Sequence, residues 1–386
     1  MTGLNGDLYF ATTRKAGLHR LQEFATLAGA NYAQHRNTDY GPAEPTAVSR
    51  LSPYIRHRLI SESEVLSKVL AQQDPKQADK FVQEVFWRTY FKGHLEHKPY
   101  LWSSYRQHLA TQFERLDQQT ALADQYQCAI GGMTGIEPFD LWAQELIDIN
   151  YLHNHTRMWF ASIWIFTLEL PWQLGADFFM QHLLDGDPAS NTLSWRWVAG
   201  LHTRGKHYLA RADNIAQYSN GRFTNICGLN ESAAAISEAP AEAGLQVPPR
   251  PTYHIDQLPG SAYSFLLHED DLHWPELTEQ ATAIAVLDAV PGRAAQNCAT
   301  TVRNFVNGAC GNVAADLAAG QLLAADAAAI ARWARDHSAT TLVTPYPPVG
   351  PVRDLLDAAN TLLKTDHLSI QYLQRSYDST AWPHCK

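Results

Sequence analysis

The sequence predicts a mostly α-helical domain followed by a smaller α/β domain with a Rossmann-like parallel sheet. A chain of 386 residues is too long for one hydrophobic core of ordinary size. In about its first 200 residues, apolar side chains recur at helical spacing, as in segments 78–94 and 140–152. After about Asn225, short β-like runs alternate with alanine-rich helical stretches. That alternation is typical of a parallel sheet covered by helices.

We expect the helical domain to span residues 1–230 and the α/β domain to span 261–386. Between them, residues 231–260 read as a linker, since 233–260 contain five prolines among alanines and acidic residues. The expected strands of the second domain are 262–267, 281–287 and 340–344. Its expected helices are 313–324, 327–337 and 352–363. No glycine-rich phosphate-binding motif occurs in this part of the sequence.

The amino-acid composition indicates an ordinary soluble globular protein. Hydrophobic residues make up 45% and charged residues 18%, as in ordinary soluble proteins. No apolar run reaches the roughly 18–20 residues of a membrane span, and the N-terminus lacks a signal-peptide pattern. We therefore expect a cytoplasmic protein without membrane contact. The five scattered cysteines form no C-x-x-C pair, which gives no indication of a metal site.

The formal charge of −9 is unevenly distributed along the chain. Residues 1–230 contain 21 Lys and Arg against 22 Asp and Glu, a net charge of −1. The remaining residues contain 9 against 17, a net charge of −8. The first part can therefore carry a local basic groove for phosphates, whereas the second is an unfavourable nucleic-acid surface.

Two motifs in the helical part are ambiguous when each is taken alone. Hydroxyls and backbone amides in Val48–Ser52 suit an anionic pyrophosphate at a helix start, but the segment also reads as a capping motif. Farther along, Glu84, Trp87 and Arg88 share one helix face by their spacing. These three are costly to bury without partners, and an amphipathic helix with a surface ion pair explains them equally well.

A third cluster comprises the segments 153–158 and 185–191 and the pair Trp195 and Trp197. The Asp-Gly-Asp at the start of 185–191 suits a turn or a calcium loop, but the alternating oxygen ligands and terminal Glu of an EF-hand are missing. The two tryptophans alone could be core rings. The order and spacing of these elements carry more information than any one of them.

Together these motifs resemble the flavin domain of photolyases and cryptochromes. The segments 151–158 and 185–191 and the W-x-W four residues later carry the resemblance. Val48–Ser52 and 83–91 match earlier motifs of that domain in the same order, and the likeness extends over roughly 17–223. The resemblance implies a helical FAD-binding domain of photolyase/cryptochrome type.

The resemblance also implies an FAD-contacting set. Tyr32 and the segment 48–52 would line the phosphate end with Arg88, and Asp187 would reach the ribityl or adenosine side. Asn154 and the pair Arg157–Asp185 would lie beside the isoalloxazine. Asn191 would face flavin N5, where Asp would mark a plant-type photoreceptor and Asn favours repair or a cryptochrome unlike the animal type. The full set is Tyr32, Val48, Ser49, Arg50, Leu51, Ser52, Phe81, Glu84, Arg88, Asn154, Arg157, Asp185, Gly186, Asp187 and Asn191.

By the same resemblance, Trp195 is the tryptophan nearest the flavin in an electron-transfer chain, and Trp172 is the middle member. An indole can give an electron to an excited oxidised flavin, and a row of indoles separates the charges. Trp102 and Tyr105 lie in the region of the third, exposed member, which the sequence does not place.

The implied lesion pocket contains Glu84, Trp87, Met158 and Trp197, with Asn154 beside the reacting groups. The two tryptophans would hold a flipped-out pyrimidine dimer between apolar rings, and Glu84 would hydrogen-bond the dimer and stabilise its radical anion. The (6-4) photolyases carry a second histidine at the position of Met158. His153 alone therefore does not indicate their chemistry, and a packed helix histidine explains it as well.

Two departures from the family pattern stand out. The first is Val48, which replaces the usual threonine. The second is the order of the domains: the family normally places an α/β antenna domain before the flavin domain, whereas here an α/β segment follows it. Segment 264–277 faintly resembles the first strand and loop of that antenna domain, and 327–344 fits the same interpretation. We therefore expect a circularly permuted order; an unrelated Rossmann-like appendage is the alternative, and an antenna pigment is doubtful.

The resulting hypothesis is a light-driven DNA photolyase, a carbon–carbon lyase. An excited reduced flavin would pass an electron to a flipped-out cyclobutane pyrimidine dimer in UV-damaged DNA. We expect a monomer. The alternatives are a cryptochrome-like blue-light photoreceptor without repair activity, or a flavin-binding remnant with neither activity.

Overall fold

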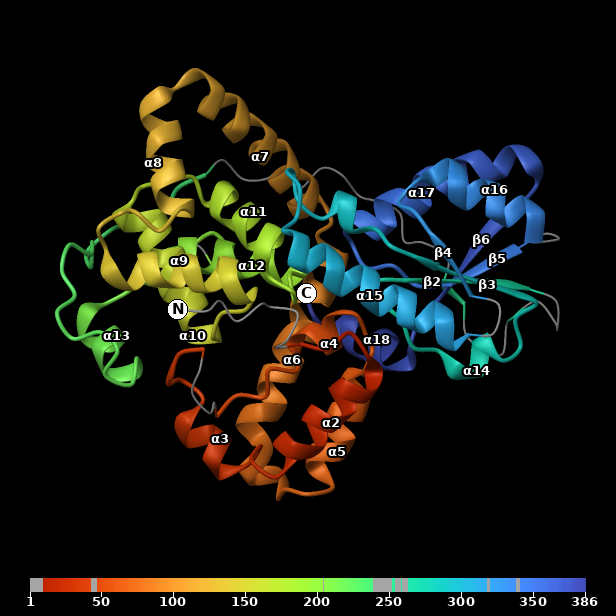
Figure 1. The fold of residues 1–386 in the computed structure, drawn as a ribbon, viewed down its shortest axis with the longest axis horizontal. Helices are drawn as coiled ribbons and strands as arrows, with labels where there is room; N and C mark the ends of the chain where they lie inside the picture. The colour runs from red at the N-terminus through yellow and green to blue at the C-terminus, as the bar shows by residue number, and fades with distance from the viewer. Residues whose placement is uncertain are drawn as a thin grey trace.

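The structure is a computed structural model that describes residues 10–42, 47–203, 205–238, 252–253, 258, 263–317, 320–337 and 341–386. A helical region is followed by a parallel sheet with its covering helices (Figure 1), so the predicted fold class is confirmed. Most of the expected linker, including 239–251, lies outside the described residues. None of the helices in the described ranges is long and apolar enough to cross a membrane.

The helical region contains the expected segments within longer elements. Segment 78–94 lies in α6, and 140–152 corresponds to α9, which ends at Ile149 because Asn150 adopts a left-handed φ of 57°. The helices are α2 Arg14–Ala25, α3 Ala30–His35, α4 Ser52–Arg56, α5 Glu62–Leu70, α6 Pro75–His97, α7 Tyr100–Gln118, α8 Thr120–Ile130, α9 Glu137–Ile149, α10 Asn154–Ser162, the π-helical turn Ile163–Thr167, α11 Trp172–His182, α12 Pro188–Ala199 and α13 Ala212–Tyr218.

The start of α12 shows how local sequence fixes a later site residue. The Asp187 carboxylate accepts hydrogen bonds from the backbone amides of Ala189 (3.1 Å) and Ser190 (2.9 Å). Pro188 occupies the first helical position, where its missing N–H costs nothing. The sequence Asp-Pro-Ala-Ser therefore starts a helix and at the same time holds the Asp187 carboxylate in one place.

The second region is built on a six-stranded, all-parallel sheet with the order β1-β6-β5-β2-β3-β4. Counted from β2, the order is the 3-2-1-4-5 arrangement of doubly wound folds, with β1 added at the edge. The elements are β1 Thr252–Tyr253, β2 Ser264–His268, α14 Pro275–Thr278, β3 Ala283–Leu287, α15 Thr300–Asp316, β4 Gly320–Leu323, α16 Ala327–His337, β5 Thr341–Pro345, α17 Pro351–Leu363, β6 Ser369–Leu373 and α18 Ser376–Ala381. Figure 1 shows α16 and α17 on one face and α15 on the other.

The helix expected over 313–324 is wrong. Helix α15 ends at Asp316, and Gly320–Leu323 form β4, which pairs with β3. Alanine-rich sequence favours a helix locally, but an edge position beside β3 offers backbone hydrogen bonds that outweigh this preference. Gly320 also lies so close to the backbone of Ala314 that a side chain there would clash.

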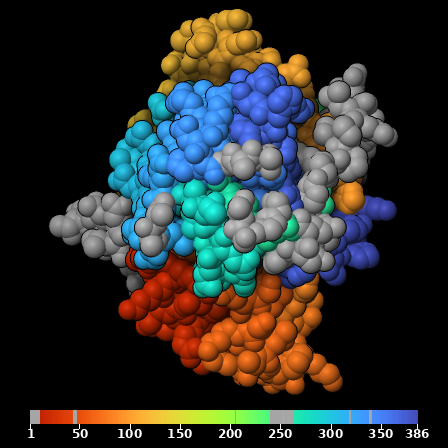
Figure 2. All heavy atoms as spheres, turned by 90° about the vertical axis from the view of Figure 1, so that its right-hand side faces the viewer, coloured from red at the N-terminus to blue at the C-terminus, as the bar shows by residue number. Residues whose placement is uncertain are grey.

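The helical region and the sheet share a hydrophobic core. One cluster joins Tyr54 and other residues of the N-terminal helices to Phe305 of α15 and Phe265 of β2. The Phe305 ring lies 6.4 Å from that of Tyr54 and 5.8 Å from that of His57. Figure 2 shows the α/β region seated directly on the N-terminal helices, drawn in red and orange. Each region therefore covers apolar surface of the other.

This shared core predicts that truncating one side chain of α15 destabilises the whole chain. Phe305→Ala should lower the free energy of unfolding by about 3–5 kcal/mol, since it leaves a cavity between the two regions. Leu362→Ala on the exposed side of α17 is the control, with an expected change within about 0.5 kcal/mol. Denaturant unfolding measures both values. Equal stabilities of the two variants would contradict a shared core.

Candidate functional site

The turn between α11 and α12 carries Asp185, Gly186 and Asp187. Arg157 of α10 donates a 2.9 Å hydrogen bond to Asp185 from Nη2 and another to the Leu152 carbonyl from Nε, so the expected Arg157–Asp185 pair is present. Burial alone would raise the pKa of Asp185, but the adjacent Arg157 guanidinium outweighs burial and holds the pKa below its ordinary value. Both groups are therefore charged and fixed.

Asp187 is surrounded by cations. Its Oδ2 lies 3.2 Å from Lys92 Nζ, 3.4 Å from Arg88 Nη2 and 3.9 Å from Arg56 Nε. Burial acts to raise the pKa of Asp187, but Lys92 and Arg88 lower it far below its ordinary value. Gly186 lies against the Arg293 guanidinium, which donates to the Leu183 carbonyl, so a side chain at Gly186 would displace Arg293.

The trio expected on one face of α6 divides between two environments. Arg88 points inward, where it also contacts Glu62 at 3.4 Å. Glu84 instead pairs with Arg36, just after α3, through Oε1. Glu84 therefore forms an ion pair at this surface, but with an arginine that follows α3 rather than with Arg88 of its own helix. Trp87 remains 53% exposed.

The segment 48–52 leads into α4, which begins at Ser52, but Leu51 occupies the N-cap position and no side chain caps this helix. Within it, Ser49 Oγ accepts a 3.3 Å hydrogen bond from the Leu51 amide, and Arg50 adopts a left-handed φ of 50°. Leu51 is buried, and the Arg50 guanidinium lies 5.8 Å from the ring centre of Tyr151. Val48 is partly buried against the shared core.

Tyr32 and Phe81 are brought together although 49 residues separate them in the sequence. Their ring centres lie 5.3 Å apart in an edge-to-face arrangement, and both side chains are buried. Burial, followed by the charge of Glu84, raises the pKa of the Tyr32 hydroxyl above its ordinary value.

On α12, the amide of Asn191 is oriented by one hydrogen bond. Its Nδ2 donates to the Ala176 carbonyl at 2.8 Å, so its oxygen is the end left to accept a ligand's proton. The hydroxyl of Ser190 and the indole Nε1 of Trp195 are buried without hydrogen-bond partners among the described residues. Such groups are costly unless a bound molecule satisfies them, so this side of α12 suits a polar cofactor.

The expected lesion residues lie on three helices that pack against one another: α6 with α12, and α10 with α12. Trp197 is 37% exposed and stacks on Tyr208 at 5.8 Å, Met158 is half-buried, and Asn154 is exposed. Trp87 is linked to the end of α12 through Tyr90 and His202, with ring centres 5.5 Å and then 6.1 Å apart. Within the described ranges, no hydrogen bond, ion pair or ring contact joins the side chains of Glu84, Trp87, Met158 and Trp197.

The expected electron-transfer tryptophans, Trp195 and Trp172, are both buried. Trp195 packs against Gly175 of α11, one helical turn after Trp172, and Gly175 leaves the space that its ring needs. Trp172 stacks on Tyr105 at 5.6 Å, and Tyr105 lies 5.5 Å from Trp102. Tyr105 therefore adjoins Trp172, and Trp102 adjoins Tyr105, but both are buried, so neither is an exposed third member.

His153 is buried and caps α10, because its Nδ1 accepts a 3.2 Å hydrogen bond from the His155 amide. Burial lowers the pKa of His153 to about 4. The interpretation of His153 as a hydrogen-bonded helix histidine therefore has a geometric basis.

Sequence reasoning missed an ion-pair network between the two regions. Arg56 pairs with Asp270 and lies 3.5 Å from Glu269. Arg58 contacts Asp271 at 3.1 Å and Asp378 at 2.7 Å. Arg56 ends α4 and Arg58 follows it, and three of the four carboxylates directly follow β2. The only signal in the sequence was the complementary charge of the segments 56–58 and 269–271, which are more than 200 residues apart.

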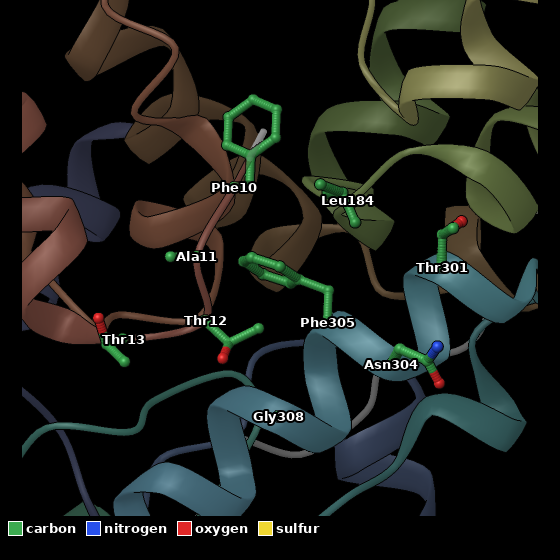
Figure 3. Close-up of a pocket in the computed structure, with 9 residues that line it drawn as sticks. All are labelled: Phe10, Ala11, Thr12, Thr13, Leu184, Thr301, Asn304, Phe305 and Gly308. Carbon is green, nitrogen blue, oxygen red and sulfur yellow. The ribbon is translucent and has the colours of Figure 1, made fainter. Parts of the chain in front are cut away.

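A cavity of about 310 Å³ lies beside the Asp185 turn, between the N-terminal segment and α15 (Figure 3). Figure 3 shows its lining residues Phe10 in the N-terminal segment, Leu184 in the loop after α11 and Phe305 on α15. A second cavity, of about 260 Å³, borders His155 and Tyr208.

Comparison with known proteins assigns this part of the chain. Residues 81–222 match the family model described as the FAD binding domain of DNA photolyase. This part of the chain is similar to the flavin domain of the photolyase/cryptochrome family. The matched residues include α12, the Asp185 turn and all the expected tryptophans. The cofactor of such a domain is FAD. The Ser190 hydroxyl and the Trp195 N–H, which are buried near Asn191 without hydrogen-bond partners among the described residues, fit such a cofactor.

Among curated family members, a deoxyribodipyrimidine photo-lyase from Streptomyces griseus is 31% identical over 182 residues. Another, from Escherichia coli, is 29% identical over 204 residues. The alignments cover 44% and 52% of this chain, but only 38% and 42% of those relatives. A crystal structure of a class III photolyase from Agrobacterium tumefaciens aligns with a TM-score of 0.44 and 25% identity, over 53% of this chain and 42% of that one.

The ion-pair network predicts loss of stability in acid. Burial raises the pKa of Asp271, but Arg375 and Arg58 outweigh burial and lower it to about 2, below the roughly 3.9 of an unfolded chain. Asp271 therefore stabilises the fold above about pH 4, by roughly 2–3 kcal/mol, and loses this effect as the pH falls through 2.

Asp271→Asn should accordingly destabilise the protein strongly at pH 7 and progressively less toward pH 3. Denaturant unfolding at several pH values measures the difference from the wild type. Asp124→Asn, which changes an exposed acid of α8, is the control and should have little effect at any of these pH values. A cost of Asp271→Asn that does not depend on pH would refute the assignment.

Proposed function

We propose that the protein is a light-driven, FAD-dependent DNA photolyase that splits cyclobutane pyrimidine dimers. The observation that carries this proposal is the pair of partly exposed tryptophans, Trp87 on α6 and Trp197 on α12. Large rings are normally buried, and exposed ones mark binding surfaces. The relatives named deoxyribodipyrimidine photo-lyase, which align with 44% and 52% of this chain, support the proposal.

At the lesion end, Trp87 and Trp197 would hold the flipped-out dimer by stacking, and Met158 would add an apolar wall. Stacking on an aromatic side chain contributes about 1–3 kcal/mol per base. Glu84 would hydrogen-bond the dimer, and its contact with Arg36 fixes the position of the carboxylate. Asn154, exposed at the start of α10, would lie between the dimer and the cofactor.

At the cofactor end, FAD supplies light absorption and the transferred electron when bound. Asn191 would accept the N5–H of the reduced flavin through its amide oxygen, which the hydrogen bond to Ala176 leaves available. The Arg157–Asp185 pair would hold the isoalloxazine, and Asp187 would fix the ribityl or adenosine side. Trp195 and Trp172 would supply electrons from within the protein.

For the α/β region we propose a permuted, antenna-like domain. The supporting observation is that segment 264–277 begins with β2, the central strand from which the doubly wound order is counted. We also propose that the protein acts as a cytoplasmic monomer on UV-damaged DNA.

Repair is tested with oligonucleotides that contain a cyclobutane dimer, illuminated in the presence of the FAD-loaded full chain. Trp87→Ala should slow repair at limiting substrate by about 5- to 150-fold, because one stacking surface is lost. Phe86→Ala is a matched control: Phe86 is the neighbouring exposed ring, but it stacks on Tyr377 of α18. An FAD-loaded wild-type protein that bleaches in blue light without repairing dimers would instead favour the photoreceptor alternative.

The electron route is tested by photoreduction of the bound FAD under blue light with an external reductant. Trp195→Phe should slow photoreduction sharply, because phenylalanine is much harder to oxidise than tryptophan. Trp142→Phe, which changes a buried tryptophan stacked on Trp159, is the control and should photoreduce normally. Normal photoreduction in Trp195→Phe would exclude this route.

A further inference from the structure

One tryptophan of the expected electron route is hydrogen-bonded to a carboxylate. The indole Nε1 of Trp172 donates to Glu238 Oε1 at 2.6 Å. Trp172 is 2% exposed, whereas the Glu238 side chain is 24% exposed. Glu238 lies 16 residues beyond the end of the family match at residue 222. It therefore belongs to a part of this chain for which the family model assigns no role.

The neighbouring indoles have no such partner. Trp164, whose ring centre lies 6.2 Å from that of Trp195, donates its N–H to the carbonyl of Pro171 at 3.0 Å. A peptide carbonyl accepts a hydrogen bond but is a very weak base. The N–H of Trp195 itself has no hydrogen-bond partner among the described residues. Of these three tryptophans, Trp172 alone donates its N–H to a group that can take up a proton.

Loss of one electron makes an indole N–H strongly acidic, because the positive charge spreads over the ring nitrogen. A carboxylate in contact with that nitrogen can take the proton without any movement of heavy atoms. We propose that Glu238 is the proton acceptor for oxidised Trp172 and that this transfer makes Trp172 the end of the internal electron route. The inference rests on the electron route of the proposed function.

Trp195 would give one electron to a bound, light-excited oxidised flavin, and Trp172 would refill Trp195 with one electron. The Nε1–H bond of Trp172 then breaks, its electron pair stays on nitrogen, and the proton binds Glu238 Oε1. The products are a neutral Trp172 radical and a neutral Glu238 carboxylic acid. Return of the electron would require the proton to return as well, so the separated state is longer lived.

The surroundings of Trp172 favour Glu238 over the next aromatic ring. Tyr105 stacks on Trp172, but its hydroxyl is buried without a hydrogen-bond partner among the described residues. A phenol is readily oxidised only if it can release its proton, so the positive charge has no favourable path through Tyr105. Gln173 Nε2 donates to Glu238 at 3.0 Å, and Arg196 Nη1 lies 3.8 Å from its second oxygen. These contacts hold the carboxylate against the indole.

The experiment is flash photolysis of the FAD-loaded full chain with Glu238→Gln. The glutamine oxygen can still accept the indole hydrogen bond, but the amide cannot accept a proton. In the wild type, the neutral tryptophan radical should form, and D₂O should slow its formation. In Glu238→Gln, the radical cation should persist until it recombines, and the yield of photoreduced flavin should fall several-fold. Glu238→Asp should restore part of the neutral radical.

Two control variants and one measurement without cofactor complete the test. Glu231→Gln changes a carboxylate of the same segment that contacts the Ala212 amide, and Tyr105→Phe removes the stacked hydroxyl. Both should behave as the wild type. In the cofactor-free protein, the Trp172 indole proton should resonate far downfield in NMR spectra and should shift upfield in Glu238→Gln but not in Glu231→Gln.

The possible failures are distinguishable. If a tryptophan radical forms and loses its proton at the wild-type rate in Glu238→Gln, Glu238 is not the acceptor and this inference is wrong, while the electron route stands. If the wild type photoreduces its flavin without any tryptophan radical, both the inference and the electron route are wrong. An indole proton of Trp172 at an ordinary chemical shift would contradict the hydrogen bond itself.

Discussion

The structure depends on how the carboxylate of Asp187 is neutralised. This group is buried, where an isolated charge is strongly unfavourable. Two backbone amides of α12 and the cations Arg56, Arg88 and Lys92 surround it. Each cation comes from α4 or α6, so one carboxylate fixes the start of α12 relative to the N-terminal helices. The Asp185 turn, Asn191 and both tryptophans of α12 take their positions from that arrangement.

The same requirement joins the α/β region to the helices. The Arg56 guanidinium contacts Asp270 and Glu269 in addition to Asp187, and both of these carboxylates lie in the loop after β2. In a doubly wound sheet, the carboxyl end of the central strand borders the crevice where ligands usually bind. Here the loop at that end is occupied by ion pairs with the helical region. The sheet therefore uses its usual ligand-binding edge to hold the helical region, alongside the hydrophobic core that the two regions share.

Sequence reasoning predicted what depends on local pattern and motif order. The Arg157–Asp185 pair and the parallel sheet both follow from short segments with few alternatives. It could not predict the partner of Glu84, because Arg36 lies 48 residues away and no periodicity links the two. The strand β4 was missed for a similar reason, since its sequence favours a helix and its pairing with β3 decides otherwise. In each case, a long-range contact determines the outcome and leaves no local signature.

Counting charge along the chain also misjudges the surface that DNA would meet. The −8 assigned to the second region includes Glu269, Asp270, Asp271 and Asp378, which are buried against cations. Arg56 and Arg58 form these same contacts. These two cations are therefore not free to bind phosphates, although the net charge of the helical region includes them. The helical region also buries carboxylates of its own, among them Glu62, Asp185 and Asp187, so its exposed surface is no less basic than its sequence. The α/β surface, in contrast, is less acidic than its sequence. Attraction of a DNA backbone to this protein must then depend on where the remaining exposed cations lie rather than on regional net charge.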